Sequence, residues 1–294
     1  MDRIKVGIVG AGGMGQLRAK WVSQHHLAQL VAVCDSSETA DAVAGKYGAA
    51  AFRRYETFLR QAGVEAVILS VPNSLHFEFA MKALAAGKHV LVEYPLATSS
   101  EEVREMVALA EKSGLILHPG HTMRFEPWVK PCLENLSRIG RLLFTTPFLW
   151  YGRKVIKWYG QESLRGNTFI FLNYHHIDQF RYLFGEVEWV EAVLDDRKEG
   201  KDLVVSSGLV MLKFCKGGCG FSMQGHGIMA PNEMGWAIVG ETGYLEYKKT
   251  PGLTRENGLF LVTDEGRQNL VLPVRDPYQV DTDHFVKEVS GKEQ

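Results

Sequence analysis

Short apolar runs alternate with segments of helical composition along the first 120 residues of the chain. Each run is nearly continuous, as in strands that are buried on both faces of a sheet. One intervening helix, 100–113, opens with the capping box Ser99-x-x-Glu102. The predicted strands lie at 4–9, 30–34, 49–52, 66–71, 89–93 and 115–118. This alternation predicts an α/β fold with a doubly wound parallel sheet and helices on both faces.

Beyond residue 120 the pattern changes to strands separated by tight turns. Helices are expected from Pro127 to residue 139 and over 174–184, with a strand at 141–151 and a loop at 153–166 between them. Further strands are predicted at 189–194, 204–214, 220–226, 236–239, 244–247, 258–262 and 269–274, before a helix over 278–289. These strands indicate an antiparallel meander. One face must cover the helices, while the other presents Trp, Met and Phe side chains and is a candidate dimer surface.

The bulk composition limits the possible classes of protein. A length of 294 residues favours two domains, and 46% hydrophobic with 23% charged residues is typical of a soluble globular protein. The net charge of −1 provides no basic footprint for nucleic acid or an anionic membrane. No apolar run reaches transmembrane length, and the first strand begins too early for a signal peptide.

Cysteine and histidine spacings predict neither disulfides nor a metal site. The chain has four cysteines, too few for a disulfide framework at this length, so we expect a cytoplasmic location. Cys215 and Cys219 flank Lys-Gly-Gly, which is better interpreted as a hairpin turn than as half of a zinc site. His118 and His121 lie close in sequence, but we find no further ligands that would complete a site with them.

The first strand runs into the turn Gly10-Ala11-Gly12-Gly13-Met14-Gly15, which fits G-x-G-x-x-G. Gly10 permits the tight turn, Gly12 lets the backbone approach a pyrophosphate, and Gly15 lets the next helix pack closely. The second strand ends in Asp35, 20 residues after Gly15, where a carboxylate would accept ribose hydroxyls. Asp35 favours NAD(H), although Ser36 and Ser37 could contact the phosphate of NADP(H). The alternative is a glycine-rich turn in some other α/β protein.

Further cofactor-binding residues are expected in the loops after the other strands, because ligands of such sheets bind beyond the carboxyl ends of the strands. The loop at 70–76 contains Val71, Pro72, Asn73 and His76, and the loop at 93–98 contains Glu93 and Tyr94. We expect these residues near a nicotinamide ring. For His76, an exposed position at the start of a helix is the favoured alternative. Glu93 is expected to hold another group in place.

Three segments resemble the Gfo/Idh/MocA oxidoreductases. They are VPNSLHFEFAMKALAAGKHVLVEYPLA (71–97), PGHTMRFEP (119–127) and HHIDQFRYLFGEV (175–187). The resemblance implies a Rossmann domain followed by an α+β domain with a large open, mostly antiparallel sheet. It also implies an NAD(P)(H)-dependent oxidoreductase that transfers hydride to or from a small sugar-, polyol- or keto-type substrate. We accordingly expect a dinucleotide-binding domain over 1–120, a substrate-binding and oligomerisation domain over 121–294, and a homo-oligomer formed through the second sheet.

The chain departs from the family pattern at two polar positions. The usual Glu-Lys-Pro motif is Glu93-Tyr94-Pro95 here, and Phe171 stands where the aspartate of Asp-x-x-x-His would be, with His175 as the histidine. A tyrosine phenol titrates near pH 10, so Tyr94 is better suited to donating a proton than to abstracting one. The Glu-Tyr-Pro motif is similar to that of biliverdin reductases, which reduce a tetrapyrrole. A conjugated C=C or C=N reductase and a non-catalytic nucleotide-binding protein therefore remain alternatives.

Candidate catalytic and substrate-binding residues follow in the second domain. On the helix at 174–184, Ile177, Phe180 and Phe184 form an apolar stripe, while His175 lies opposite it with Asp178, Gln179 and Tyr182. His175 is interpreted as the main acid–base group, with Tyr94 orienting or protonating substrate; the alternative for His175 is a solvated surface residue. His176 is expected in the core. The candidate substrate-binding residues are Arg124, Trp158, Tyr159 and His175, with Arg165 nearby, although Trp158 could instead anchor its loop.

The family usually returns one more helix to the first domain after the segment corresponding to 278–289. The sequence ends at Gln294, so that helix is expected to be missing or to lie beyond the sequence.

Overall fold

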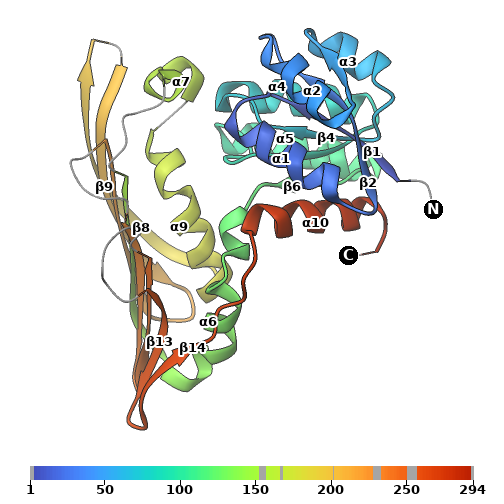
Figure 1. Ribbon diagram of the computed structural model, residues 1–294. Helices are drawn as coiled ribbons and strands as arrows, with labels where there is room; N and C mark the ends of the chain where they lie inside the picture. Colours follow the sequence, from blue (N-terminus) through green and yellow to red (C-terminus); the bar gives the residue numbers. More distant parts are fainter. Residues whose placement is uncertain are drawn as a thin grey trace. The chain divides into compact units, whose positions relative to one another are not determined.

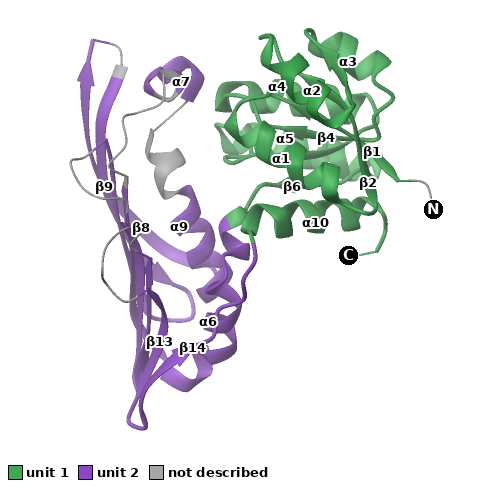
Figure 2. Ribbon diagram, viewed as in Figure 1, with its two compact units in different colours: residues 1–122, 276–294 green, residues 123–275 purple. Residues whose placement is uncertain are grey.

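The computed structural model describes residues 3–151, 157–165, 168–200, 202–227, 233–249 and 257–292. The chain divides into two compact units, one of residues 1–122 with 276–294 and one of residues 123–275 (Figure 2). The predicted second domain, 121–294, included a C-terminal segment that in the structure belongs to unit 1. The reason is α10 (Pro277–Val289), which packs on unit 1 through Phe285 and Val286. This helix therefore returns to the first domain.

Unit 1 contains a six-stranded parallel sheet in the order β3-β2-β1-β4-β5-β6 (Figure 1). Its strands are β1 (Ile4–Val9), β2 (Ala28–Cys34), β3 (Ala50–Phe52), β4 (Ala66–Leu69), β5 (His89–Val92) and β6 (Leu117–Pro119). The strand order reverses at β1, which pairs with β2 on one side and β4 on the other. A crevice for ligands is expected at that reversal, beyond the carboxyl ends of both strands. The predicted doubly wound parallel sheet is confirmed.

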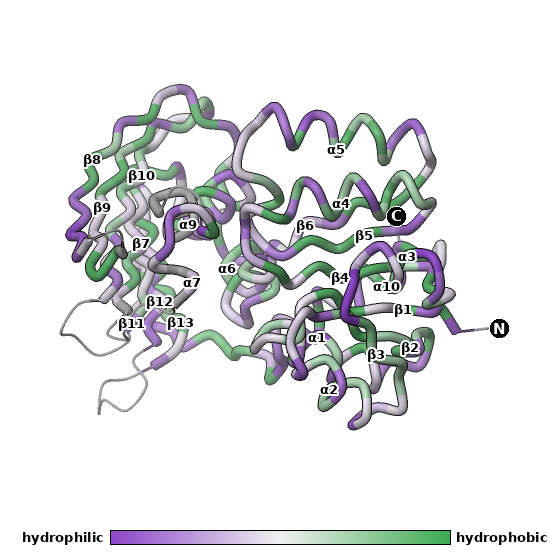
Figure 3. Tube along the Cα trace, turned by 90° about the horizontal axis from the view of Figure 1, so that it is seen from above, coloured by the Kyte–Doolittle hydropathy of each residue, from purple (hydrophilic) through white to green (hydrophobic). Residues whose placement is uncertain are grey.

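Helices cover both faces of this sheet. One face packs against α1 (Gly13–Gln24), α2 (Thr39–Tyr47) and α10. The other packs against α3 (Tyr55–Gln61), α4 (His76–Ala85) and α5 (Ser100–Ser113), and η1 (Asn73–Leu75) precedes α4. Beyond its first residue, strand β5 is hydrophobic, whereas α5 alternates between hydrophobic and hydrophilic turns (Figure 3). The capping box of α5 forms as predicted, with the Ser99 hydroxyl accepting the Glu102 N–H at 3.2 Å.

Unit 2 contains an eight-stranded sheet in the order β14-β13-β12-β11-β7-β10-β9-β8. Its strands are β7 (Leu142–Tyr151), β8 (Val187–Glu199), β9 (Asp202–Phe214), β10 (Cys219–His226), β11 (Glu233–Gly240), β12 (Gly243–Lys249), β13 (Gly258–Thr263) and β14 (Gly266–Leu270). The mostly antiparallel sheet is confirmed, but it is not one meander. Strand β7 lies in the middle, antiparallel to β11 and parallel to β10.

Side chains of β9 alternate between a covered and an exposed face, whereas β8 is exposed along nearly its whole length. Val210 and Leu212 of β9 are buried against Phe180 of α9 (Thr168–Phe184), together with residues of α6 (Val129–Asn135). Leu209 and Met211, one position along, are 52% and 41% exposed. The exposed apolar row across neighbouring strands consists of Phe144, Trp189, Val193, Leu209, Met211, Phe221 and Tyr244. We call this row the outer sheet face.

Several predicted boundaries in unit 2 are wrong. The predicted loop at 153–166 contains α7 (Lys157–Gly160) and α8 (Glu162–Arg165) within its described part. The helix from Pro127 is split into α6 and a 3-10 turn, η3 (Leu136–Ile139), after the further 3-10 turn η2 (Thr122–Phe125). The strand expected at 269–274 is β14, which ends at Leu270 because it pairs there with Leu259, near the start of its partner β13 at Gly258. Val271 and Val274 beyond it are exposed.

Two further findings bear on earlier expectations. The Lys216-Gly217-Gly218 turn between β9 and β10 is a hairpin in which both glycines have positive φ, +90° and +84°. Within the described residues, no helix has the length and apolar content needed to cross a membrane.

Candidate active site

The glycine turn of unit 1 has two glycines that pack tightly and two that face open space. Gly10 has φ +90°, and a Cβ there would lie 2.3 Å from the Ser70 carbonyl oxygen. A Cβ on Gly15 would lie 1.7 Å from the Gly10 carbonyl oxygen, so only glycine fits at either position. A Cβ on Gly12 or Gly13 would have no described atom within 4 Å.

The same turn begins α1, which starts at Gly13, with Met14 half-buried in its first turn. Among the described side chains none caps this helix. The first N–H groups of a helix lack intrahelical partners and attract anions. The free space over Gly12 and Gly13 therefore fits a pyrophosphate, as the sequence predicts.

Asp35 follows β2 and is tied to the glycine turn. Its Oδ2 accepts the Ala11 N–H at 2.7 Å, and its Oδ1 accepts the Ser37 N–H at 2.8 Å and hydroxyl at 2.7 Å. Burial raises the pKa of this carboxyl, but these hydrogen bonds outweigh burial and leave the pKa lowered. Each carboxylate oxygen has two lone pairs, so acceptor capacity remains for a ribose hydroxyl. Ser36, next to Asp35, is exposed.

A cation also lies beside this strand end. The guanidinium of Arg53 donates to the Ser37 carbonyl oxygen and to the carboxylate of Asp41. Its side chain is 41% exposed, so donors remain accessible. The end of β2 therefore places the carboxylate of Asp35, which suits a ribose hydroxyl, near the cation of Arg53, which suits a phosphate.

The loops after β4 and β5 are joined by His76. Its Nδ1 lies 2.7 Å from the Pro95 carbonyl oxygen and its Nε2 lies 2.9 Å from the Val71 carbonyl oxygen. His76 is 1% exposed, and burial lowers its pKa. The favoured prediction of an exposed residue at a helix start is wrong, because the ring is buried between carbonyl oxygens of the two loops, and the single N–H of its neutral form can donate to one of them. Asn73 is buried beside it, whereas Val71, Pro72 and Tyr94 are half-buried.

Glu93 is held by a buried arginine that the sequence reasoning missed. Arg18 Nε donates to Glu93 Oε1 at 2.6 Å, and Arg18 Nη2 lies 2.6 Å from Asp281 Oδ2 of α10. Burial lowers the pKa of Arg18, but the two carboxylates outweigh burial and raise it. Arg18 also donates to the Thr282 hydroxyl at 2.9 Å. The expectation that Glu93 holds another group agrees with this pair, which fixes the residue that precedes Tyr94.

One sequence signal could have revealed Arg18. It lies on the face of α1 formed by Gly15, Ala19 and Val22, all of which are buried. A charged residue on a buried helix face requires a partner of opposite charge. The pattern identifies the requirement, but not the partner, which lies 263 residues later at Asp281.

In unit 2, α9 presents His175 beside a fixed ion pair. Arg124, in η2, donates to both carboxylate oxygens of Asp178 at 2.9 and 2.6 Å, and its guanidinium lies 5.0 Å from the Tyr182 ring centroid. The side chain of Arg124 remains 36% exposed, so it can still meet a ligand. His175 is half-buried, one helical turn before Asp178. Asp178 is thus a structural partner of Arg124.

The neighbouring His176 belongs to a different environment. It is 1% exposed, and its Nδ1 lies 2.7 Å from the Ser222 hydroxyl and 3.0 Å from the Gln224 amide nitrogen. Burial, with a smaller contribution from His175, lowers the pKa of His176 to about 3. The prediction of a core histidine is confirmed. Gln179, expected on the polar face, is instead buried and donates to the Met123 carbonyl oxygen at 2.9 Å.

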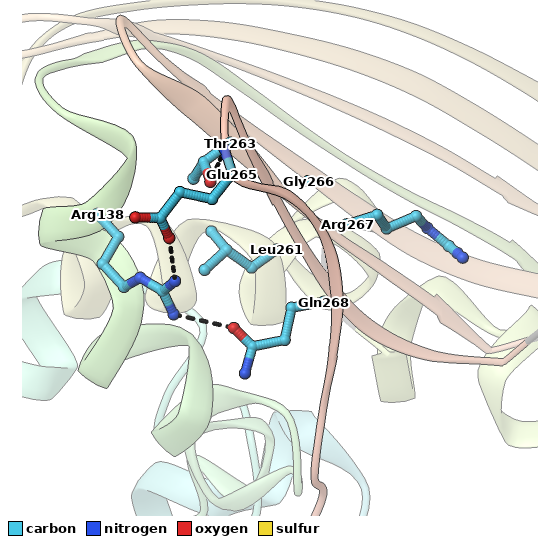
Figure 4. Close-up of a pocket in the computed structure, with 7 residues that line it drawn as sticks. All are labelled: Arg138, Leu261, Thr263, Glu265, Gly266, Arg267 and Gln268. Carbon is cyan, nitrogen blue, oxygen red and sulfur yellow. Dashed lines mark hydrogen bonds and ion pairs between the residues drawn. The ribbon is translucent and has the colours of Figure 1, made fainter.

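The remaining candidate substrate residues lie on the short helices of unit 2. Trp158 is half-buried on α7 and Arg165 is buried on α8. The side chain of Tyr159 lies outside the described residues. A pocket beside the β13–β14 hairpin contains none of the predicted residues (Figure 4). Arg138 bonds Gln268 there at 3.1 Å, so we interpret it as a surface feature of the hairpin.

Comparison with known proteins places both units in one family. Residues 4–121 match the family model described as "Oxidoreductase family, NAD-binding Rossmann fold", and residues 137–246 match the GFO/IDH/MocA C-terminal domain. The rhizopine catabolism protein MocA of Rhizobium meliloti is 26% identical over 188 residues, 63% of this chain and 59% of that protein. Inositol 2-dehydrogenase of Rhizobium meliloti (strain 1021) is 29% identical over 222 residues, 73% and 66% of the two chains. The chain thus spans less than two thirds of these relatives' lengths.

A solved structure shares the fold over nearly the whole chain. Biliverdin reductase from Synechocystis sp. PCC 6803, in complex with biliverdin and NADP+, has a TM-score of 0.89 and 23% identity. The likeness covers 99% of this chain and 92% of that one. At this identity the likeness establishes the architecture alone.

Proposed function

The chain belongs to the GFO/IDH/MocA oxidoreductase family, and from this premise we propose that it transfers hydride between NAD(P)(H) and a small sugar-, polyol- or keto-type substrate. The observation that supports the proposal most is the glycine turn, where Gly10 and Gly15 admit no side chain and Gly12 and Gly13 face free space. Inositol 2-dehydrogenase and the D-glucoside 3-dehydrogenase of Escherichia coli, 30% identical over 190 residues, suggest the substrate class.

Unit 1 holds the coenzyme in this proposal. The N-terminus of α1 receives the pyrophosphate, and Asp35 accepts hydrogen bonds from the adenosine ribose. Its lowered pKa keeps it ionised near neutral pH, and a carboxylate there repels a 2′-phosphate. NADH is therefore favoured, while Arg53 and Ser37 leave NADPH possible.

The coenzyme preference can be tested by fluorescence titration with NADH and NADPH. We expect tighter NADH binding in the parent, and a shift toward NADPH in Asp35→Ser, which keeps a short polar side chain without the charge. Tighter binding of NADPH by the parent would overturn the assignment to NADH.

Proton transfer is assigned to residues of this chain. The bound nicotinamide supplies or accepts the hydride, and a hydroxyl or carbonyl of the substrate must exchange a proton as this happens. We assign that proton to His175, which is half-buried on α9, because imidazole is the side chain most often used for proton transfer near neutral pH. Tyr94 donates a hydrogen bond or a proton to the substrate, and Arg124 binds it.

The variants His175→Ala and Tyr94→Phe separate the proposal from its main rival. We expect His175→Ala to lower kcat/KM for a polyol or sugar substrate by about 10²–10⁴-fold, the usual size of general acid–base catalysis. Loss of activity only in Tyr94→Phe would instead favour a biliverdin-reductase-like enzyme that protonates a conjugated C=C or C=N bond. Bound coenzyme without hydride transfer to any of a broad substrate panel would favour a non-catalytic family member.

We also propose that the protein is a homo-oligomer, a dimer or tetramer, formed through the outer sheet face. Seven large apolar side chains from β7, β8, β9, β10 and β12 lie along this face, each between 39% and 65% exposed. Large apolar side chains exposed on one face of a sheet are typical of a protein–protein interface.

A cytoplasmic location is part of the same proposal. All four cysteines are free thiols, with Cys34 and Cys132 buried and Cys215 and Cys219 exposed. Exposed free thiols are best suited to a reducing compartment. Detection of the protein in the cytosolic fraction of the producing cell would support this location.

A further inference from the structure

A second cluster of ionisable side chains lies in unit 1, where β6 meets α10. His118 Nδ1 is 2.7 Å from Glu288 Oε2, and His284 Nδ1 is 3.5 Å from the same oxygen. One ligating atom from each residue lies within 4.8 Å of the other two. His284 and Glu288 are four residues apart on α10, so their side chains share one face of the helix. His118 reaches them from a strand 166 residues earlier.

The arrangement around His118 resembles the support that proteins give to a metal-binding histidine. Its Nε2 is 3.1 Å from Oδ1 of Asp281, a carboxylate that is itself fully buried. A metal-binding imidazole commonly donates its other N–H to a carboxylate, which fixes the ring and the tautomer. With Nε2–H donating to Asp281, Nδ1 would be the ligating atom, 2.7 Å from Glu288 Oε2 and within 4.8 Å of a ring nitrogen of His284. Asp281 and Glu288 thus present carboxylate oxygens to the two ring nitrogens of His118, at 3.1 and 2.7 Å.

The charges of the connected network leave room for such a cation. Three carboxylates, Glu93, Asp281 and Glu288, are linked through Arg18 and His118, and Arg18 is the one permanent positive charge among them. With His118 neutral, as a metal-binding imidazole must be, three negative charges against one positive charge leave an excess of two. The nearest lysine on α10, Lys287, is paired with Asp283 at 2.8 Å. A divalent cation would balance the excess.

We propose that His118, His284 and Glu288 bind a divalent first-row transition ion, with Zn²⁺ as the metal that best suits two imidazoles and one carboxylate. The ligand atoms of such a site lie about 3.2–3.5 Å apart for bonds of about 2.0–2.2 Å. His284 and Glu288 can adjust to this spacing because their side chains are 35% and 23% exposed. Their exposure also leaves an entry path and an open coordination position for water. The metal takes the place of the proton on His118 Nδ1.

The role of this site is structural. It fastens α10 to β6, and α10 supplies Asp281 to the buried Arg18–Glu93 pair. The metal therefore stabilises the helix whose carboxylate holds the loop of Glu93 and Tyr94. Sequence spacing alone could not identify it, since His118 and His121 are close in sequence whereas the partners of His118 lie on α10.

The test uses the full-length, tag-free chain after treatment with a chelator. Added Co²⁺ should give the visible d–d absorption of an ion bound by nitrogen and oxygen. A free Zn²⁺ concentration of about one hundred times the Kd should raise Tm by about 5 °C. His284→Ala and Glu288→Gln should each weaken binding at least tenfold and lose most of the Tm rise. The matched controls His26→Ala, an exposed histidine of the same unit, and Glu111→Gln, an exposed glutamate of α5, should keep both signals.

Two outcomes would overturn the site. One is an absence of Co²⁺ absorption and of any Zn²⁺-dependent Tm rise in the parent. The other is a parent-like response in His284→Ala and Glu288→Gln, which would place the metal elsewhere on the surface. Circular dichroism without metal shows whether each variant is folded, so a loss of binding can be separated from a loss of structure.

Discussion

Each unit contains a buried polar network, and the two networks are made of different chemistry. In unit 1 the network is ionic, with Arg18 between Glu93 and Asp281 at 2.6 Å from each. In unit 2 it is neutral, with His176 against Ser222 and Gln224, and Trp236 donating to the Thr145 hydroxyl at 2.5 Å. Each network includes the sequence neighbour of a candidate catalytic residue. Glu93 precedes Tyr94, and His176 follows His175.

The difference concerns what each network tolerates. A buried charge that loses its partner retains its full desolvation cost, so the ionic network requires all its members. In a neutral network, removal of one side chain costs only the hydrogen bonds of that side chain. Protonation of a member is more costly, because it places an unpaired charge in the interior. Unit 1 should therefore respond most to the removal of a side chain, and unit 2 to a fall in pH.

The largest effect is expected for Arg18→Met. The substitution leaves Glu93 as a buried carboxylate without its cation and leaves Asp281 with His118 alone, which should lower the free energy of unfolding by about 3–5 kcal/mol. Urea unfolding followed by fluorescence and circular dichroism measures the loss. Arg104→Met is the control, because that arginine is 68% exposed and paired only on the surface, and should cost less than about 0.5 kcal/mol. Equal losses of unfolding free energy in Arg18→Met and Arg104→Met would show that the buried ionic network does not stabilise unit 1.

A pH effect of intermediate size is expected from His176. Its pKa is lowered to about 3 in the folded state, so between pH 6.5 and 3 only the unfolded chain takes up this proton, and stability falls as pH falls. Between pH 7 and pH 5 this proton uptake should lower the free energy of unfolding by about 2 kcal/mol. His176→Gln keeps hydrogen-bonding groups toward Ser222 and Gln224 without a titrating group. Its unfolding free energy should therefore fall less between pH 7 and pH 5 than that of the parent. If the unfolding free energies of the parent and His176→Gln fell equally with pH, His176 would not be buried as a neutral ring.

The smallest effect on protomer stability is expected on the outer sheet face. Val193 and Leu209 face each other across β8 and β9, 65% and 52% exposed. Replacing both by lysine should change the unfolding free energy of the protomer by less than about 0.5 kcal/mol, yet dissociate the oligomer through charge repulsion. Light scattering after gel filtration measures the mass. Val107→Lys, at a 38% exposed valine of α5, is the matched control. A monomeric parent would contradict the proposed interface.

Features that depend on neighbouring residues were predicted correctly from the sequence. The glycine turn, the capping box of Ser99 and Glu102, and the parallel sheet of unit 1 follow from short patterns of residues. The assignment of His176 to the core follows in the same way, from the helical period of α9. In each case the chemistry that fixes the structure lies within a few residues in the chain.

Features that depend on distant segments were missed. The burial of His76 requires the Pro95 carbonyl oxygen, 19 residues away, and the Arg18–Asp281 pair joins opposite ends of the chain. The central position of β7 depends on strands that follow it by about 70 residues or more. Each of these features depends on contacts between residues that are distant in the chain. The sequence shows at most one side of such a contact, such as a charged residue on the buried face of α1.

The most direct test of the central claim compares two glycines of the same turn. A Cβ on Gly12 would meet no described atom, and its φ of −68° suits any residue, whereas a Cβ on Gly15 would clash with the backbone at 1.7 Å. Gly12→Val should therefore fold like the parent but occupy the space of the pyrophosphate, weakening NADH binding at least tenfold in a fluorescence titration. Unchanged NADH affinity in folded Gly12→Val, or no binding of either coenzyme by the parent at millimolar concentration, would contradict a dinucleotide site at this turn.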